Sequence, residues 1–206
     1  PSQHFGFNAN YFLAFAQRFP ARKISYAASF GRDRVSASEA AQLPPLLRHF
    51  DAISVREASG VTLVERATGH KPANVPDPTL LHSDYAELTG SAPPGDDDPY
   101  LFCYGLRSPD NIRQTADLVA QQLGFSIRSP HNPHRRWVEI GDTVYPDPGE
   151  WVSLIRNARF VVTNSFHGTV FSLLFKKPFI VAGLTGDKAT ANARAIHLLR
   201  AVGLES

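Results

Sequence analysis

The sequence predicts an α/β fold with Rossmann-like parallel sheets flanked by helices. Short apolar, β-branched runs such as 51–55 and 159–162 indicate buried strands. Each is followed by polar capping residues and then by apolar positions at helical spacing, which indicate a helix. Strands and helices alternate on both sides of a stretch rich in proline, glycine and acids at 90–99. Together these observations predict two Rossmann-like lobes, the first with only about three strands.

Composition limits the class of protein. The chain has 206 residues, of which 43% are hydrophobic and 19% charged, as in folded globular proteins. A net charge of +2 gives no reason to expect a nucleic-acid partner. Residues 99–206 hold 12 Lys and Arg against 8 Asp and Glu, which suits an anionic small ligand.

Compartment and chain ends give further expectations. The single Cys103 lies in an apolar run and has no partner for an internal disulfide, which favours a reducing compartment. No apolar run is long enough to span a bilayer, and the N-terminus lacks the pattern of a secretory signal. We therefore expect a cytoplasmic protein. Because the chain contains no Met, we also expect it to be a piece of a longer or processed protein.

The first half contains alternating helix and strand signals. The segment 8–19 has helical spacing and ends at Pro20, and 23–29 indicates a strand. A helix is expected within 36–50, with two prolines near its first turns or splitting it in two. A short strand at 51–55 precedes a helix that ends at Gly69, with Ser54 and Glu57 as an expected capping box. An extended piece follows at 73–76.

Two places in the first half are candidates for anion binding. Ser29 and Gly31 follow the first strand, where backbone N–H groups and Arg32 could hold an anion; solvated loop charges are the alternative. Arg56 lies at the end of the second strand. It either faces a ligand or pairs with a neighbouring carboxylate, and pairing is the preferred interpretation. Asp77, before a proline, is expected to cap local N–H groups.

The second half repeats the alternation. We place a linker at 93–98, a partial N-terminal lobe at 1–92 and a C-terminal lobe at 99–206. Strands are expected at 100–106 and 125–127, with a helix between them. The basic loop 128–137 has no Cys or acid to complete a metal site. A helix at 146–157, a strand–helix–strand unit at 159–181, a glycine-bearing loop and a helix at 189–202 complete the chain.

The strand–helix–strand unit at 159–181 holds the main functional candidate. Thr163, Asn164 and Ser165 are typical capping residues, and His167 and Gly168 fall in the first helical turn. The positive end of a helix dipole attracts an anion, and a glycine allows a ligand to approach closely. An imidazole there suits proton transfer or the binding of phosphate or carboxylate. The alternative is a histidine that only caps the helix or satisfies an interior polar group.

These motifs resemble the polysaccharide pyruvyl transferase family. The matching pieces, in order, are ISYAASFG at 24–31, AISVRE followed by a glycine at 52–60, VPDPTLL at 75–81 and VVTNSFHGTVFSLLFKKPFI at 161–180. A last piece, ANARAIHLLRAVGL at 191–204, fits less closely. The resemblance implies a glycosyltransferase-B-like, two-lobed arrangement with the first lobe incomplete. It also implies transfer of the enolpyruvyl group of phosphoenolpyruvate to two hydroxyls of a sugar, which leaves a pyruvate ketal.

The resemblance also implies roles for residues. His167 aligns with the histidine of the family's Arg-Leu-His-Gly motif, and Ser165 stands in place of its arginine. Another cation then compensates, or the donor differs. The expected catalytic residue is His167, with no metal and no cofactor. The expected donor-binding residues are Asn164, Ser165, Gly168, Arg107, Arg56 and Lys188.

The expected partners are a small-molecule donor and a glycan acceptor. Peripheral contact with lipid-linked glycans is compatible with the absence of a membrane-spanning run. Two alternatives remain at this point: a non-catalytic module that binds a sugar or nucleotide sugar, and a glycosyltransferase that uses a nucleotide sugar.

Overall fold

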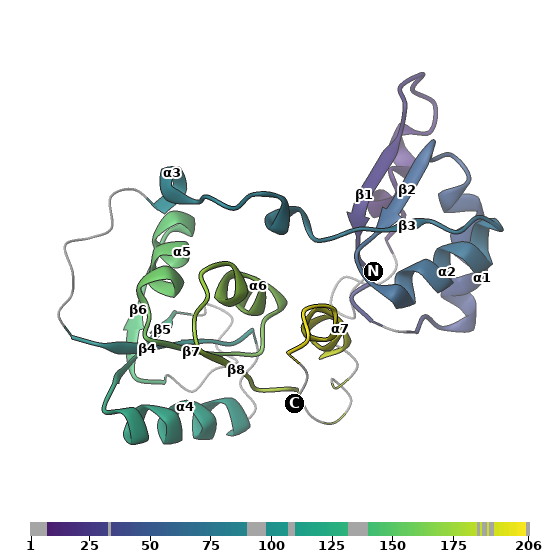
Figure 1. Ribbon diagram of the computed structural model, residues 1–206. Coiled ribbons are helices and arrows are strands. Elements are labelled where there is room, and N and C mark those ends of the chain that lie inside the picture. The colour runs from purple at the N-terminus through teal and green to yellow at the C-terminus, as the bar shows by residue number, and fades with distance from the viewer. Residues whose placement is uncertain are drawn as a thin grey trace. The chain divides into compact units, whose positions relative to one another are not determined.

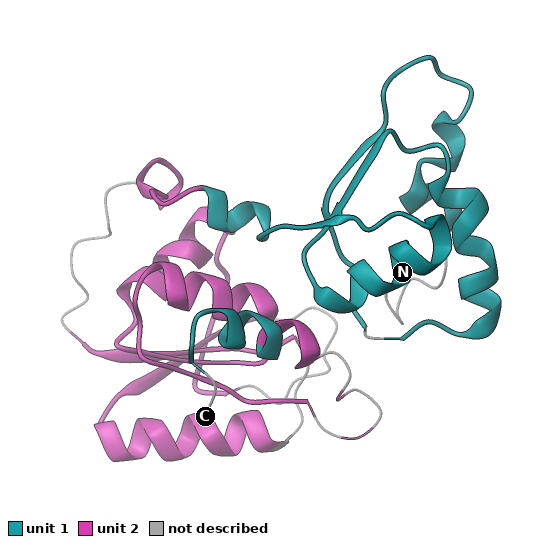
Figure 2. Ribbon diagram, turned by 45° about the vertical axis from the view of Figure 1, so that its right-hand side comes forward, with its two compact units in different colours: residues 1–81, 196–206 teal, residues 82–195 magenta. Residues whose placement is uncertain are grey.

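The computed structural model describes residues 8–32, 34–89, 98–106, 110–131, 140–184, 186, 189 and 192–204. The chain divides into two compact units (Figures 1 and 2). Unit 1 comprises Pro1–Leu81 with Ile196–Ser206, and unit 2 comprises His82–Ala195. Both contain parallel strands connected by helices, so the predicted α/β class with Rossmann-like parallel sheets is confirmed. No helix in these described ranges is both long and apolar enough to cross a membrane.

The boundary between the units follows Leu81 and so precedes the expected linker at 93–98. Only Asp98 of that linker lies within the described residues. Side-chain contacts explain why the short helix α3 (Ala86–Thr89) groups with unit 2. Ser153 Oγ donates a hydrogen bond to the Thr89 carbonyl at 3.2 Å, and Arg156 Nη1 donates to Thr89 Oγ1 at 3.1 Å.

Unit 1 is built on a three-stranded parallel sheet in the order β1-β2-β3. Ile24 of β1 pairs with Ala52 of β2, and Ser54 of β2 pairs with Ala73 of β3. Its elements are η1 (Ala9–Phe12), η2 (Ala14–Ala16), β1 (Ile24–Ala28), α1 (Ala37–Leu47), β2 (Ala52–Val55), α2 (Ala58–Thr68), β3 (Ala73–Asn74) and η3 (Pro78–Leu81).

Two local expectations in unit 1 are wrong. The segment 8–19 forms two short 3-10 helices instead of one helix, because Leu13 adopts a left-handed conformation with φ 54° between them. Ser54 does not cap α2. It lies inside β2, where its hydroxyl donates to the Ser25 carbonyl and accepts from the Ala27 N–H. Glu57 is the N-cap residue of α2 and makes no side-chain capping bond.

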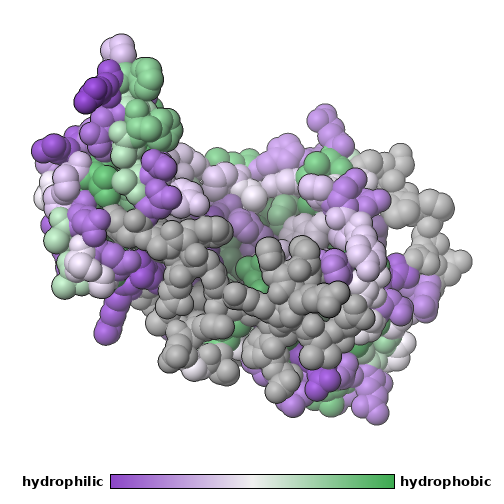
Figure 3. Space-filling view, turned by 180° about the vertical axis from the view of Figure 1, so that it is seen from behind, coloured by the Kyte–Doolittle hydropathy of each residue, from purple (hydrophilic) through white to green (hydrophobic). Residues whose placement is uncertain are grey.

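The core of unit 1 lies between the sheet and helices α1 and α2. Leu43, Leu47, Val55 and Val64 are at most 6% exposed. In contrast, large apolar or aromatic side chains at the start of the unit remain at the surface, with exposed fractions of 48–67%: Tyr11, Phe15, Phe19, Ile24 and Tyr26. Figure 3 shows hydrophobic areas of the surface in green among hydrophilic ones.

Unit 2 is built on a five-stranded parallel sheet in the order β6-β5-β4-β7-β8. The central pair β4 and β7 is in register from Leu101–Phe160 to Tyr104–Thr163. The strands are β4 (Tyr100–Tyr104), β5 (Ser126–Pro130), β6 (Asp142–Val144), β7 (Phe160–Thr163) and β8 (Phe179–Val181). The longer helices are α4 (Asp110–Leu123), α5 (Pro148–Asn157), α6 (Phe166–Leu174) and α7 (Ala193–Ala201), the last of which continues into the residues grouped with unit 1.

Helices cover both faces of this sheet. Figure 1 shows α4 below the sheet and α5 and α6 above it. Ile112 and Ala116 of α4 pack on one face, and Val152, Ile155 and Phe171 from α5 and α6 pack on the other. The central strands β4 and β7 are consequently buried on both sides, which explains why they are continuous apolar runs and not alternating ones.

Candidate active site

The order of the strands in unit 2 defines where a ligand is expected. β4 comes first in the chain, β5 and β6 add on one side of it, and β7 and β8 add on the other. The side on which strands are added therefore changes between the neighbouring strands β4 and β7. In open parallel sheets, ligands bind outside the carboxyl ends of the strands at such a switch point. The loops after β4 and β7 meet at this place.

The turn after β7 is fixed to the end of β4 by hydrogen bonds. Thr163 Oγ1 donates to the Tyr104 carbonyl, and the Asn164 N–H donates to the same carbonyl at 3.3 Å. Asn164 Oδ1 in turn accepts from the Leu106 N–H at 2.7 Å. Asn164, a predicted donor-binding residue, therefore joins the two loops of the switch point.

Ser165 begins helix α6 as its N-cap residue. It is 2% exposed, and its hydroxyl accepts a hydrogen bond from the Gly168 N–H at 3.3 Å. Its own N–H donates to Thr163 Oγ1 at 3.1 Å. Ser165 was expected to bind donor, but burial and capping explain its presence here without a ligand.

Gly168 was expected to leave room for a ligand, but Thr163 fills the space where its side chain would lie; its role as a donor-binding residue stays a prediction. It is buried and faces strand β7. A Cβ atom at this position would lie 2.3 Å from Thr163 Oγ1 and 3.0 Å from Thr163 Cβ. The glycine is therefore required for the close packing of α6 on β7, and no ligand can use the space.

His167 is the candidate catalytic residue, and its side chain is exposed. Its ring lies edge to face against the ring of Phe166, with 5.4 Å between the ring centroids and 77° between the planes. Between the buried residues Ser165 and Gly168, the first turn of α6 thus directs an imidazole to the surface at the switch point. Proton transfer to a bound molecule requires this accessibility.

Arg194 was missed by sequence reasoning. It lies in the first turn of α7, and its guanidinium carbon is 5.6 Å from the centroid of the Phe166 ring. Phe166 therefore contacts both the imidazole of His167 and a guanidinium group. Arg194 lies in the segment 191–204, which resembles the family less closely, and sequence reasoning assigned this arginine no role.

Among the other cations predicted to bind donor, Arg56 lies within the described residues. Arg107 and Lys188 lie outside the described residues. Arg56 belongs to unit 1, where its Nη1 forms an ion pair with Asp77, so the preferred interpretation of pairing is confirmed. Asp77 also accepts hydrogen bonds from the N–H and hydroxyl of Thr79, at 3.0 and 2.7 Å, and so caps local N–H groups as predicted.

The predicted anion loop after β1 already binds a carboxylate of the protein. Glu57, which is 4% exposed, accepts hydrogen bonds from the Phe30 N–H at 2.7 Å and from the Ser29 hydroxyl at 2.9 Å. The Gly31 N–H donates to the Ser29 hydroxyl at 3.1 Å. Sequence reasoning treated Glu57 as a capping partner, and so did not predict that its carboxylate binds the N–H and hydroxyl groups of this loop.

Arg32 completes this loop and is also engaged. Its Nη2 lies 2.5 Å from Oε1 of Glu39. The hydrogen bond from Arg32, and then the one from the Ser36 backbone, lower the pKa of Glu39 from 4.5 to about 2. The positive charge expected to face a ligand thus stabilises the first turn of α1.

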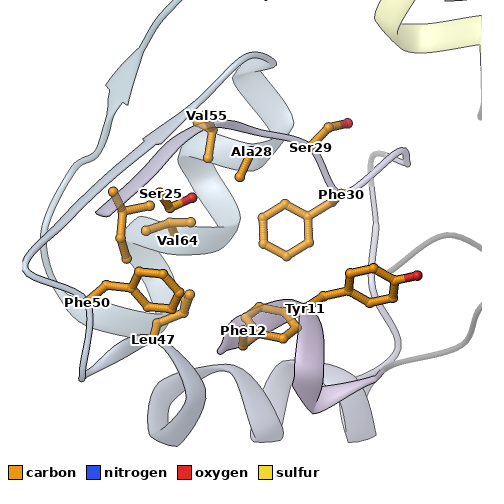
Figure 4. Close-up of a pocket in the computed structure, with 11 residues that line it drawn as sticks. Tyr11, Phe12, Ser25, Ala28, Ser29, Phe30, Leu47, Phe50, Val55 and Val64 are labelled. Atoms are coloured by element: carbon orange, nitrogen blue, oxygen red, sulfur yellow. The ribbon is translucent and has the colours of Figure 1, made fainter. Parts of the chain in front are cut away.

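Unit 1 contains an apolar cavity of about 400 Å³ between η1, the sheet and helices α1 and α2 (Figure 4). Phe12, Phe30 and Phe50 line it, and its polar lining side chains are Tyr11, Ser25 and Ser29. Because no charged group lines the cavity, it does not offer the cation that an anionic donor needs.

Unit 2 is a Rossmann-like α/β lobe with an exposed histidine at the switch point of its sheet. This combination is typical of α/β proteins that bind small ligands at the carboxyl edge of their strands. The sequence profile described as polysaccharide pyruvyl transferase matches residues 2–184, and the chain belongs to this family. No curated protein sequence matches the chain.

Two solved structures are similar in fold. One is the UDP-GlcNAc 2-epimerase of Neisseria meningitidis bound to UDP-GlcNAc, with a TM-score of 0.46, 14% identity, and coverage of 72% of this chain and 49% of that one. The other is the UDP-N-acetylglucosamine 2-epimerase of Rickettsia bellii, with a TM-score of 0.44, 13% identity, and coverage of 88% and 58%. The chain therefore spans between about half and three fifths of the length of these proteins.

Proposed function

We propose that the protein transfers a pyruvyl group from phosphoenolpyruvate to a sugar of a polysaccharide or glycan intermediate and forms a pyruvate ketal. Membership of the polysaccharide pyruvyl transferase family supports the reaction type and a glycan acceptor. The observation that carries the proposal is the exposed imidazole of His167 in the first turn of α6, at the switch point of the sheet.

His167 is the proposed general acid. An enolpyruvyl ester becomes electrophilic at C2 when its methylene carbon gains a proton, and an imidazolium at the mouth of the site can supply one. The electron pair of the C=C bond forms the new C–H bond, and an oxocarbenium ion remains at C2. Neutral imidazole then remains as a base for the proton of the attacking sugar hydroxyl.

Two sugar hydroxyls complete the reaction. The first hydroxyl adds to C2 and loses its proton, and the phosphate leaves with the electron pair of its C–O bond. The second hydroxyl adds to C2 and its proton is carried by phosphate or water. The two hydroxyl protons are thus balanced by the new methyl hydrogen and by the released hydrogen phosphate. The scheme uses no metal and no cofactor, and both expectations stay predictions.

Helix α6 assists by its position. Its positive dipole end points to the place where the donor phosphate and carboxylate would lie, and an anion there is stabilised. One N–H of this first turn, that of Gly168, already bonds to the Ser165 hydroxyl. Side-chain cations are therefore needed for tight binding of a donor with several negative charges.

Transfer in deuterated water tests this proposal. The full chain is incubated with phosphoenolpyruvate and a pyruvate-free glycan, and phosphate release and glycan mass are followed. We expect ketal formation with phosphate release, and one solvent-derived deuterium in the ketal methyl group. Phosphate release without a ketal, or a ketal methyl group without solvent deuterium, would contradict the mechanism.

A further inference from the structure

We propose that Arg194 is a donor-binding residue that holds an oxyanion of the donor beside His167. This inference rests on the proposed function and deepens it. The family motif places an arginine two residues before the histidine, where this chain has Ser165 buried as a helix cap. The structure instead brings a guanidinium group to the same turn from a later segment of the chain.

The ring of Phe166 connects the two groups. The guanidinium carbon of Arg194 lies 5.6 Å from the ring centroid, and the imidazole centroid of His167 lies 5.4 Å from it. A cation over an aromatic ring is held in place by the ring. Guanidinium and imidazole thus both contact the ring of Phe166. A planar guanidinium matches a carboxylate or phosphate with two parallel hydrogen bonds.

Two asparagines fix the segment that carries Arg194. Asn111 Nδ2, from the first turn of α4, donates to the Gly183 carbonyl at 2.7 Å. Asn192 accepts from the Leu184 N–H and donates to the Leu184 carbonyl, both at 2.8 Å. The chain after β8 is therefore tied at one end to α4 and at the other to Asn192, two residues before Arg194. This arrangement limits the positions that Arg194 can take relative to the sheet edge.

The packing of Gly183 also holds the chain after β8 in place. A Cβ atom on Gly183 would lie 3.2 Å from Asn192 Nδ2. The preceding residue, Ala182, is 7% exposed, and its N–H donates to the Thr163 carbonyl at 2.8 Å. The loop is thereby joined to the end of β7, the strand that leads directly to His167.

The charge of the segment also favours an anion. Between residues 151 and 204 the sequence contains one acidic residue, Asp187, and several Lys and Arg. Some of these cations belong to the opposite edge of the sheet. Arg156 and Arg159 shortly precede β7, and Lys177 shortly precedes β8, so these three residues lie near the amino ends of the strands. Arg194 is the described cation of this stretch in contact with the His167 turn.

Donor kinetics and direct anion binding test the role of Arg194. Arg194→Gln removes the charge and keeps a polar side chain of similar shape, and Arg194→Lys keeps the charge without the planar fork. Arg200→Gln is the control, because Arg200 is exposed on the same helix. Loss of a charge-assisted hydrogen bond predicts a KM for phosphoenolpyruvate that is roughly 10–100-fold higher in Arg194→Gln. Arg194→Lys should recover part of the loss, and Arg200→Gln should match the wild type.

Binding of inorganic phosphate and of pyruvate, measured by the NMR shifts of the His167 ring, gives a readout that is independent of turnover. The two ligands distinguish a phosphate from a carboxylate as the oxyanion held by Arg194. We expect one of them to shift the ring signals of the wild type and to lose affinity in Arg194→Gln. If the wild type transfers pyruvyl groups and Arg194→Gln equals it in KM and in anion affinity, the inference about Arg194 is wrong and the proposed function stands. If the wild type neither binds these anions nor transfers, the proposed function fails with it.

Discussion

Gly168→Ala tests the conclusion that this glycine serves packing and not ligand approach. The added Cβ would lie 2.3 Å from Thr163 Oγ1, 3.0 Å from its Cβ and 3.2 Å from its Cγ2. Thr163 cannot yield easily, because it is fully buried and β7 is paired with both β4 and β8. The variant must therefore move the helix away from the strand or rotate the threonine.

The expected loss of stability follows from three terms. Overpacking costs about 1–3 kcal/mol. Rotation of the threonine would also sacrifice its hydrogen bond to the Tyr104 carbonyl, at about 1 kcal/mol. Higher helix propensity of alanine returns about 0.5–1 kcal/mol. We therefore expect a net loss of about 2 kcal/mol, or a decrease in Tm of roughly 4–8 °C for a chain of this size.

Thermal unfolding followed by circular dichroism measures this loss, with Gly60→Ala as the control. Gly60 also lies at the start of a helix after a strand, but its added Cβ would be 3.2 Å from the nearest atom, Val55 Cβ. This control should lose clearly less stability than Gly168→Ala, because its shortest contact is longer by almost 1 Å. In a Thr163→Ala background, Gly168→Ala should cost less by at least about 0.5 kcal/mol, because the closest atom is gone. A Gly168→Ala protein with unchanged Tm and lost donor binding would refute the packing argument.

Two further predictions concern unit 1. Because Arg32 holds the folded-state pKa of Glu39 at about 2, below 4.5, this pair stabilises the fold above pH 4.5 and the contribution is lost as the pH falls towards 2. In urea unfolding between pH 6 and 2, Arg32→Ala should lose this part of the pH dependence and Arg34→Ala should keep it; equal profiles would contradict the assignment. Glu57→Ala should destabilise the protein by about 3 kcal/mol, since it leaves the Phe30 N–H without its acceptor and removes a charge near Arg56. Glu65 is exposed, so Glu65→Ala should change the free energy of unfolding by no more than about 0.5 kcal/mol in the same thermal assay. An equally small effect of Glu57→Ala would contradict the stabilising role of the buried Glu57 carboxylate.

The alternation of strands and helices was predictable because it depends on local sequence patterns. Apolar runs buried on both faces and capping residues located β2, β7 and α6 within a few residues. β6 (Asp142–Val144) was not predicted, because a three-residue edge strand with a polar start has no apolar run. The helix expected at 8–19 failed through one left-handed residue, Leu13, which helical spacing does not reveal.

The site was only partly predictable, because its geometry depends on contacts between distant segments. Spacing located His167 at the start of a helix, and the structure shows its side chain exposed. The packing role of Gly168 depends on a threonine in the preceding strand, and Glu57 binds a loop almost thirty residues earlier in the chain. Arg194 reaches the His167 turn through Phe166, a contact that no local motif encodes.

The central claim is that the exposed imidazole of His167 transfers a proton to the donor. Measurement of kcat for pyruvyl transfer by His167→Ala, with His70→Ala as the control, tests it most directly. His70 is also exposed, and its Nδ1 lies 3.0 Å from the carbonyl oxygen of Thr68, two residues earlier in the chain. We expect His167→Ala to fold with an unchanged Tm and to lose roughly 10²–10⁴-fold in kcat, while His70→Ala retains the wild-type rate. A folded His167→Ala protein with wild-type kcat would contradict the account.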